Sequence, residues 1–198
     1  MPSAALQNWN GPRQGRINQL LGAHKAVGGG GRGRRWTTEQ INWSLTIRIA
    51  GEFQGFCRDL HDDAVECFVR NVAGSNQGLA TVLQSRLTDN RKLDTGNAHP
   101  GSLGNDFARF GITLWSALEV ADSRASRWNR SLTLMNRARN AIAHADEGTL
   151  SALKVEGCKL QQLATVKRWI ADVNGLATLM DKVLADYLAI LLGCSRPW

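Results

Sequence analysis

The chain has 198 residues, enough for one domain with a sizeable buried core, and 43% of them are hydrophobic, which excludes a disordered chain. No apolar run reaches the length of about 18 residues that spans a membrane, and the N-terminus lacks the pattern of a secretion signal. The formal net charge of +7 favours RNA or DNA as a partner, although a protein can also be basic without one.

Four cysteines are scattered along the chain without the C-x-x-C spacing of a metal or redox motif. They are Cys57, Cys67, Cys158 and Cys194. We therefore expect reduced thiols in a cytoplasmic protein, and neither a disulfide framework nor a zinc site.

The N-terminal part, residues 1–36, is expected to hold a short helix over residues 3–21 and then a glycine-rich linker, "HKAVGGGGRGRRW". No predicted strand precedes the glycines, so the sequence does not favour a phosphate-binding loop of a nucleotide-binding fold. A flexible linker is the better interpretation. Its arginines are candidates for contacts with an RNA backbone: Arg32, Arg34 and Arg35.

Residues 37–198 are expected to form one helical domain. "TTEQ" offers a capping box in which Thr37 begins a helix and Gln40 closes the first turn. Apolar residues then recur at steps of three and four, which predicts one long amphipathic helix to about Val72. The segment "LTDNRKLDTGNAHPGSLG" is rich in turn formers and is expected to be an extended loop.

Helical spacing resumes over residues 107–121 and again over residues 128–142, after a break at "SRASR". In the last segment, apolar residues stand seven apart in two interleaved series, which predicts a helix from about Lys159 to Leu192. Packing within the molecule is favoured over a coiled coil between chains. The expected fold class is all-α, a helical bundle with a long C-terminal helix.

The segment "RNAIAHADEG" brings an arginine, an amide and an imidazole to the end of one of these helices. On a helical wheel Arg139 falls between Leu132 and Met135, inside the apolar arc, where an unpaired charge is costly. His144 lies about 140° around a regular helix from Arg139. Either the backbone breaks near Ala143, or a second copy of the chain completes the site.

This segment resembles the motif of the HEPN superfamily, small helical-bundle proteins common in toxin–antitoxin and antiphage systems. Their hallmark is an arginine, usually a polar neighbour, and a histidine four to six residues on, matched here by Arg139, Asn140 and His144. "EQINWSLTIRIAGEFQGFCRDL" is similar to the first core helix of such nucleases, with Glu52 at the acidic position. "GRGRRW" departs from the glycine–arginine–proline turn expected before that helix. The resemblance covers about residues 37–192.

The resemblance implies a metal-independent endoribonuclease without a cofactor, the toxin or effector of a toxin–antitoxin or defence system. RNA supplies its own nucleophile, the 2′-hydroxyl, so a proton-transfer group and charge stabilisation at the phosphate suffice. His144 would exchange the proton and Arg139 would bind the phosphate. Asn140 would orient the phosphate or the histidine, and Glu52 would hold Arg139. HEPN nucleases typically form homodimers in which two motifs face a shared cleft, and a cognate antitoxin is a possible partner.

Other interpretations stay open. Arg48 and Glu52, four residues apart, are compatible with a simple surface ion pair. His144 can instead interact with the negative end of its helix. The chain can also be a non-catalytic HEPN protein with a binding or antitoxin-like role, or a plain helical nucleic-acid-binding module. A solvated acidic patch is favoured over a metal site for the cluster in "LHDDAVE": His61, Asp62, Asp63 and Glu66.

Overall fold

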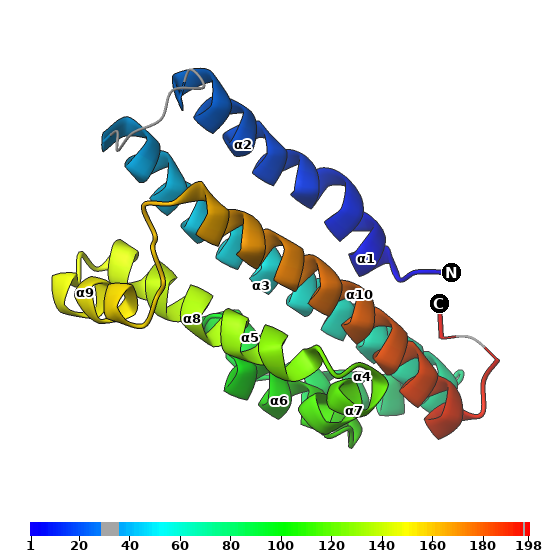
Figure 1. Ribbon diagram of the computed structural model, residues 1–198. Coiled ribbons are helices and arrows are strands. Elements are labelled where there is room, and N and C mark those ends of the chain that lie inside the picture. Colours follow the sequence, from blue (N-terminus) through cyan, green and yellow to red (C-terminus); the bar gives the residue numbers. More distant parts are fainter. Residues whose placement is uncertain (29–35, 196) are drawn as a thin grey trace.

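A computed structural model describes residues 1–28, 36–195 and 197–198 of the chain. Helices make up the regular structure of these ranges, and no strand occurs in them, which confirms the all-α class (Figure 1). None of the described helices is both long and apolar enough to cross a membrane. The arginines predicted to contact RNA from the linker lie outside the described residues: Arg32, Arg34 and Arg35.

The N-terminal helix is longer than predicted and contains a π-helical turn. It consists of α1 (Ala4–Asn8), the turn η1 (Trp9–Arg13) and α2 (Gln14–Gly28). Pro12 lies within η1, where a wider turn accommodates a residue that cannot donate a backbone hydrogen bond. Trp9 and Ile17 are fully buried in the same core as the rest of the bundle, so the boundary expected at residue 36 does not separate two cores.

Helix α3 (Trp36–Ala73) is the longest element of the bundle and packs against α1, α2, α4, α8 and α10. It includes Thr37, so the prediction that Thr37 caps this helix is wrong. The apolar residues at steps of three and four face inward. Phe53 and Phe56 are both fully buried, and their rings lie 5.9 and 5.7 Å from the ring of Trp9. This aromatic cluster fixes the N-terminal helix on α3.

Three helices follow α3 along the chain in a region where the sequence patterns predicted none. They are α4 (Gln77–Thr88), α5 (Lys92–Thr95) and α6 (Pro100–Phe107). The prediction of an extended loop over residues 87–104 is therefore wrong.

The physical reason is that polar side chains in or next to this segment cap its helices and accept hydrogen bonds from their backbone. Asp106 is buried, and its carboxylate accepts hydrogen bonds from the backbone N–H groups of Lys92 and Leu93 at 3.0 and 2.8 Å. His99 caps α6 by accepting from the N–H of Gly101 at 3.2 Å. The bonds of Asp106 join residues 13 and 14 positions apart, which local spacing does not connect.

The helix predicted over residues 107–121 is interrupted. It is divided into η2 (Ala108–Phe110) and α7 (Leu114–Ala121) by Gly111, whose φ is 87°. The hydroxyl of Tyr187 donates to the carbonyl of Phe110 at 2.8 Å, and a Cβ on Gly111 would lie 2.9 Å from that hydroxyl oxygen. Glycine supplies both the left-handed backbone and the space here.

The C-terminal part agrees best with the sequence patterns. Helix α8 (Ala125–Ala143) and helix α10 (Leu163–Leu192) match two predicted helices, although α10 begins four residues later than Lys159. The short helix α9 (Glu147–Val155) was not predicted. Because α10 packs along α3, α7 and α8, its apolar seam is used within the molecule, as favoured (Figure 1).

Candidate functional site

The backbone break expected near Ala143 is present. Helix α8 ends at Ala143, and the backbone N–H of His144 still donates to the carbonyl of Asn140 at 3.0 Å. Ala145 then adopts a positive φ of 51°, and Asp146 caps α9 by accepting from a backbone N–H at 3.0 Å. His144 is therefore the C-cap of α8 at the corner between two helices, and the backbone leaves the helix only after it.

Arg139 and Asn140 are joined by a hydrogen bond. The Nη1 of Arg139 donates to the Oδ1 of Asn140 at 3.0 Å. Arg139 is half-buried beside the apolar arc that includes the buried Leu132 and Met135, whereas Asn140 is exposed. Among the described residues, no carboxylate forms an ion pair with Arg139.

A second amide, that of Asn97, completes this arrangement. The Nδ2 of Asn97, in the segment between α5 and α6, donates to the same Oδ1 of Asn140 at 2.7 Å. The segment is anchored to α8 by Asn136, which is buried and donates to the carbonyl of Ala98 at 3.1 Å. The Oδ1 of Asn140 accepts both bonds, and among the described residues its Nδ2 has no acceptor. No sequence pattern links Asn97 to a motif 43 residues away.

His144 is exposed and interacts with the start of α9. The pKa of Asp146 is lowered chiefly by the backbone and hydroxyl hydrogen bonds of Thr149, with a smaller contribution from the charge of His144. An imidazole at the end of α8 also fits the alternative in which it only stabilises the helix end. Its exposure allows proton exchange with a ligand in either case.

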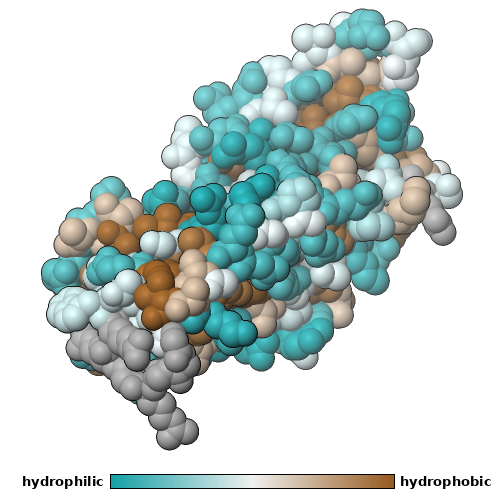
Figure 2. Space-filling view, turned by 90° about the horizontal axis from the view of Figure 1, so that it is seen from above, coloured by the Kyte–Doolittle hydropathy of each residue, from teal (hydrophilic) through white to brown (hydrophobic). Residues whose placement is uncertain are grey.

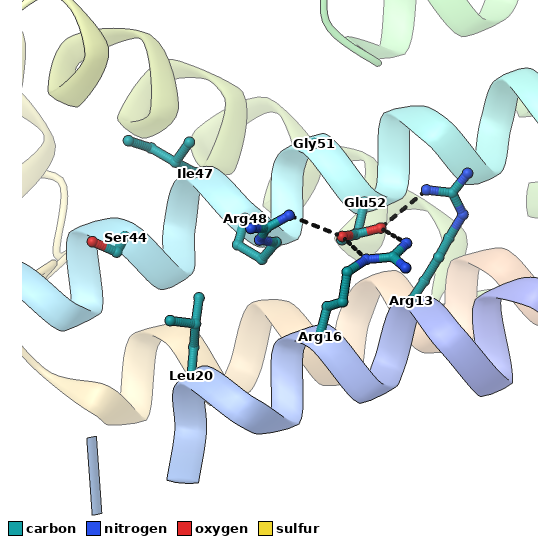
Figure 3. Close-up of a pocket in the computed structure, with 8 residues that line it drawn as sticks. All are labelled: Arg13, Arg16, Leu20, Ser44, Ile47, Arg48, Gly51 and Glu52. Atoms are coloured by element: carbon teal, nitrogen blue, oxygen red, sulfur yellow. Dashed lines mark hydrogen bonds and ion pairs between the residues drawn. The ribbon is translucent and has the colours of Figure 1, made fainter. Parts of the chain in front are cut away.

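Glu52, expected to hold Arg139, is engaged elsewhere in the described structure. It is 5% exposed and faces α2, not α8 (Figure 3). Its carboxylate accepts from three guanidinium groups, which belong to Arg13, Arg16 and Arg48. The Arg48–Glu52 ion pair exists at 3.3 Å, but its carboxylate is buried, so it is not a simple surface pair.

The three arginines surround an open cleft of about 730 Å³ between α2 and α3 (Figure 3). Hydrogen bonding to Arg16 lowers the pKa of Glu52, against the opposing effect of burial, and Arg13 adds to the lowering. Arg13 passes over Gly55, where a Cβ would lie 2.7 Å from its Cζ, and its Nη2 binds Asp59 at 2.7 Å.

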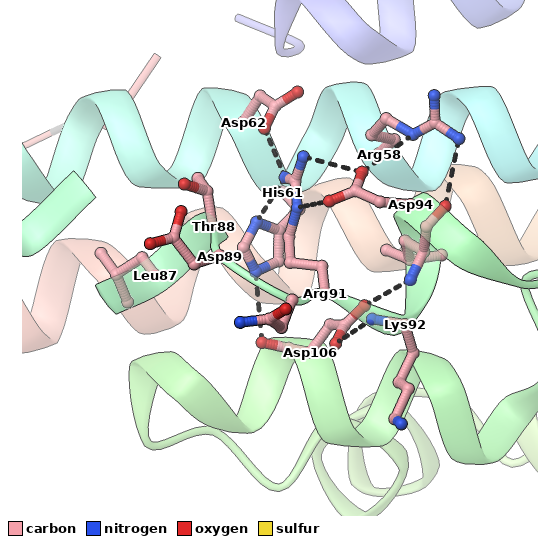
Figure 4. Close-up of polar contacts among 12 residues, drawn as sticks. Arg58, His61, Asp62, Leu87, Thr88, Asp89, Arg91, Lys92, Asp94 and Asp106 are labelled. Carbon is pink, nitrogen blue, oxygen red and sulfur yellow. Dashed lines mark hydrogen bonds and ion pairs between the residues drawn. The ribbon is translucent and has the colours of Figure 1, made fainter. Parts of the chain in front are cut away.

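The residues of "LHDDAVE" bind separate partners, so the expectation of a solvated acidic patch is wrong for most of them. His61 is fully buried, and Asp62 pairs with Arg91, which also binds Asp94 at 3.1 Å (Figure 4). Asp63 accepts from a backbone N–H of α1 at 2.8 Å. No group of three or more potential metal ligands occurs among the described residues.

His61 has a partner on each ring nitrogen. Its Nδ1 lies 3.1 Å from the Nη1 of Arg91, and its Nε2 lies 3.2 Å from the carbonyl oxygen of Asp106. Because Arg91 can only donate, Nδ1 must accept, and Nε2 carries the proton. Burial, together with the nearby charge of Arg91, lowers the pKa of His61 to about 4.

Comparison of the chain with models of known protein families, with curated proteins and with solved structures finds no match.

Proposed function

We propose that the chain is a metal-independent endoribonuclease of HEPN type, acting as the toxin or effector of a toxin–antitoxin or antiphage-defence system. The observation that carries the proposal is the end of α8. There, among the described residues, Arg139 has no acidic partner and the amide nitrogen of its bonded neighbour Asn140 has no acceptor, and His144 is exposed. The all-helical bundle would then be a HEPN bundle.

The arrangement is suited to attack by the 2′-hydroxyl of RNA on its own phosphodiester. His144 takes a proton from that hydroxyl or gives one to the departing 5′-oxygen. Arg139 binds the non-bridging oxygens, where negative charge increases in the transition state, and the amide of Asn140 donates to them. The bond from O2′ to phosphorus forms and the bond to O5′ breaks. The products are a 2′,3′-cyclic phosphate and a 5′-hydroxyl.

We further propose that two copies of the chain pair so that their motifs face one cleft, as HEPN nucleases typically do. A single chain offers one Arg139–Asn140 pair and one exposed His144, and Glu52 does not support that pair within the same chain. RNA is the proposed substrate, an antitoxin protein is a possible further partner, and the cytoplasm is the proposed compartment. The linker arginines are proposed as additional RNA contacts: Arg32, Arg34 and Arg35.

The test is RNA cleavage by purified His144→Ala protein, with His24→Ala as the matched control, because His24 lies on α2, outside the motif. We expect His144→Ala to lower the single-turnover rate by about 10²–10⁴, the range for loss of a general acid or base, and His24→Ala to leave it unchanged. Arg139→Lys should restore little of the activity that Arg139→Ala loses, because lysine lacks the planar fork.

Cleavage should also survive EDTA and require a 2′-hydroxyl. The proposal fails if His144→Ala cuts RNA as fast as the wild type, or if EDTA abolishes cleavage and a divalent metal restores it. Wild-type protein that binds RNA without cutting it would instead support the non-catalytic alternative.

A further inference from the structure

The cleft between α2 and α3 holds more positive charge than its folding role requires. Arg13 and Arg16 come from the N-terminal helix, and their bonds to Glu52 join that helix to α3. Arg48 lies on α3 itself, one turn from Glu52, so its bond to Glu52 connects no two elements. A third cation beside a carboxylate that already has two adds repulsion to the folded state.

Two of these arginines converge and keep donors free. The Nε of Arg16 and the Nη1 of Arg48 both bind the Oε1 of Glu52, at 2.6 and 3.3 Å, so the two guanidinium groups lie close together. Among the described residues, Arg16 has no partner for Nη1, and Arg48 has none for Nε or Nη2. Their side chains are 42% and 49% exposed. Arg13, by contrast, is 14% exposed and uses both Nη atoms on carboxylates.

The rest of the cleft favours an anion with an apolar neighbour. Glu52 is the only carboxylate among the described lining residues, and it is fully engaged. Gly51 leaves room in the cleft, and Leu20 from α2 and Ile47 from α3 are its apolar lining residues (Figure 3). Hydrophilic side chains cover most of the face on which α1 and α2 lie (Figure 2). The cleft is therefore open to an extended polar ligand.

We infer that Arg16 and Arg48 bind a phosphate group in this cleft. Two guanidinium groups that converge from neighbouring helices can each donate to one non-bridging oxygen, and the added negative charge offsets their repulsion. The source of the phosphate is an RNA strand whose base contacts Leu20 and Ile47, and this choice of source rests on the proposed function. The site is separate from the motif at the end of α8, so it positions RNA and takes no part in the chemistry.

The test measures affinity for a 2′-O-methyl RNA oligonucleotide, which binds but lacks the nucleophile, at several salt concentrations. The key variant is Arg48→Gln, which keeps all bonds of Arg13 and Arg16 to Glu52 and should stay folded. Arg70→Gln is the matched control, because Arg70 also lies on α3 and pairs with a glutamate one turn away. We expect Arg48→Gln to weaken binding about tenfold and to reduce the slope of log affinity against log salt by about one. Arg48→Lys should recover the slope but only part of the affinity.

A second arm titrates inorganic phosphate and follows it by NMR of the arginine Nε–H groups. Phosphate binding that Arg48→Gln abolishes, with RNA affinity unchanged, would support the phosphate site and overturn RNA as its source. Unchanged affinity for both ligands in Arg48→Gln and Arg16→Gln overturns the site altogether. If both variants cut and bind RNA as the wild type does, the proposed function stands and the phosphate site is overturned. If RNA binding depends on Arg48 but the wild type cuts no RNA, the phosphate site stands and the proposed function is overturned.

Discussion

Acidification should destabilise the protein through His61, well before its carboxylates are protonated. The ring is fully buried, and its Nδ1 accepts a hydrogen bond from the guanidinium of Arg91. A second proton on the ring would remove that acceptor and place two cations side by side away from water. Burial and Arg91 accordingly lower the pKa of His61 to about 4, from an ordinary value of 6.5.

The sign and the size follow from proton linkage. Above about pH 6.5 neither the folded nor the unfolded state protonates this histidine, and its titration does not affect stability. Between about pH 6.5 and 4, His61 is protonated in the unfolded state but stays neutral in the folded state. The free energy of unfolding therefore falls as the pH falls. The loss is roughly 2 kcal/mol by about pH 5 and about 3 kcal/mol in total, since each pKa unit corresponds to about 1.4 kcal/mol.

The assay is urea denaturation of the wild type and of His61→Gln at about pH 7.5 and about pH 5. Glutamine can accept from Arg91 and donate to the carbonyl of Asp106 without titrating. The His61→Gln variant should be less stable than the wild type at the higher pH, because it loses the ring contacts of His61 with Phe107 and Phe110. The centroids of those rings lie 5.3 and 4.9 Å from the centroid of the His61 ring. Carboxylates titrate alike in both proteins and cancel in the difference. A wild-type advantage that stays the same at both pH values would refute a buried, neutral His61.

Three further outcomes are expected. Gly55→Ala should lower the free energy of unfolding by about 1–3 kcal/mol, because the new Cβ displaces Arg13. Gly51→Ala, one turn away with open space around it, should raise the free energy of unfolding by up to about 1 kcal/mol. Thermal unfolding of the two variants tests this, and equal effects would contradict the close approach of Arg13 to Gly55. Asn97→Ala should slow RNA cleavage with little change in RNA affinity, because Asn140 loses the bond that orients its amide, and a normal rate would remove Asn97 from the site. Light scattering at micromolar concentration should give a dimer, and a 21.7 kDa monomer would count against a shared site.

The sequence predicted the helices whose apolar residues repeat over many turns and failed where single long-range bonds decide. The patterns of α3, α8 and α10 extend far enough to be read without the fold. Helices α5 and α6 depend on the buried carboxylate of Asp106, whose hydrogen bonds reach residues 13 and 14 positions away. The turn formers in that segment predict a loop, because the burial of Asp106 and its bonds to distant residues do not show in the local sequence.

The candidate site divides in the same way. The sequence by itself determined the all-helical class, the basic charge, and the succession of Arg139, Asn140 and His144 at a helix end, because each depends on neighbours along the chain. Only the tertiary structure decided that Asn97 orients Asn140. Only the tertiary structure shows that Glu52 binds Arg13, Arg16 and Arg48 and not Arg139. The register and rotation of packed helices determine which of their side chains meet. Residue spacing along the sequence does not give that register or rotation.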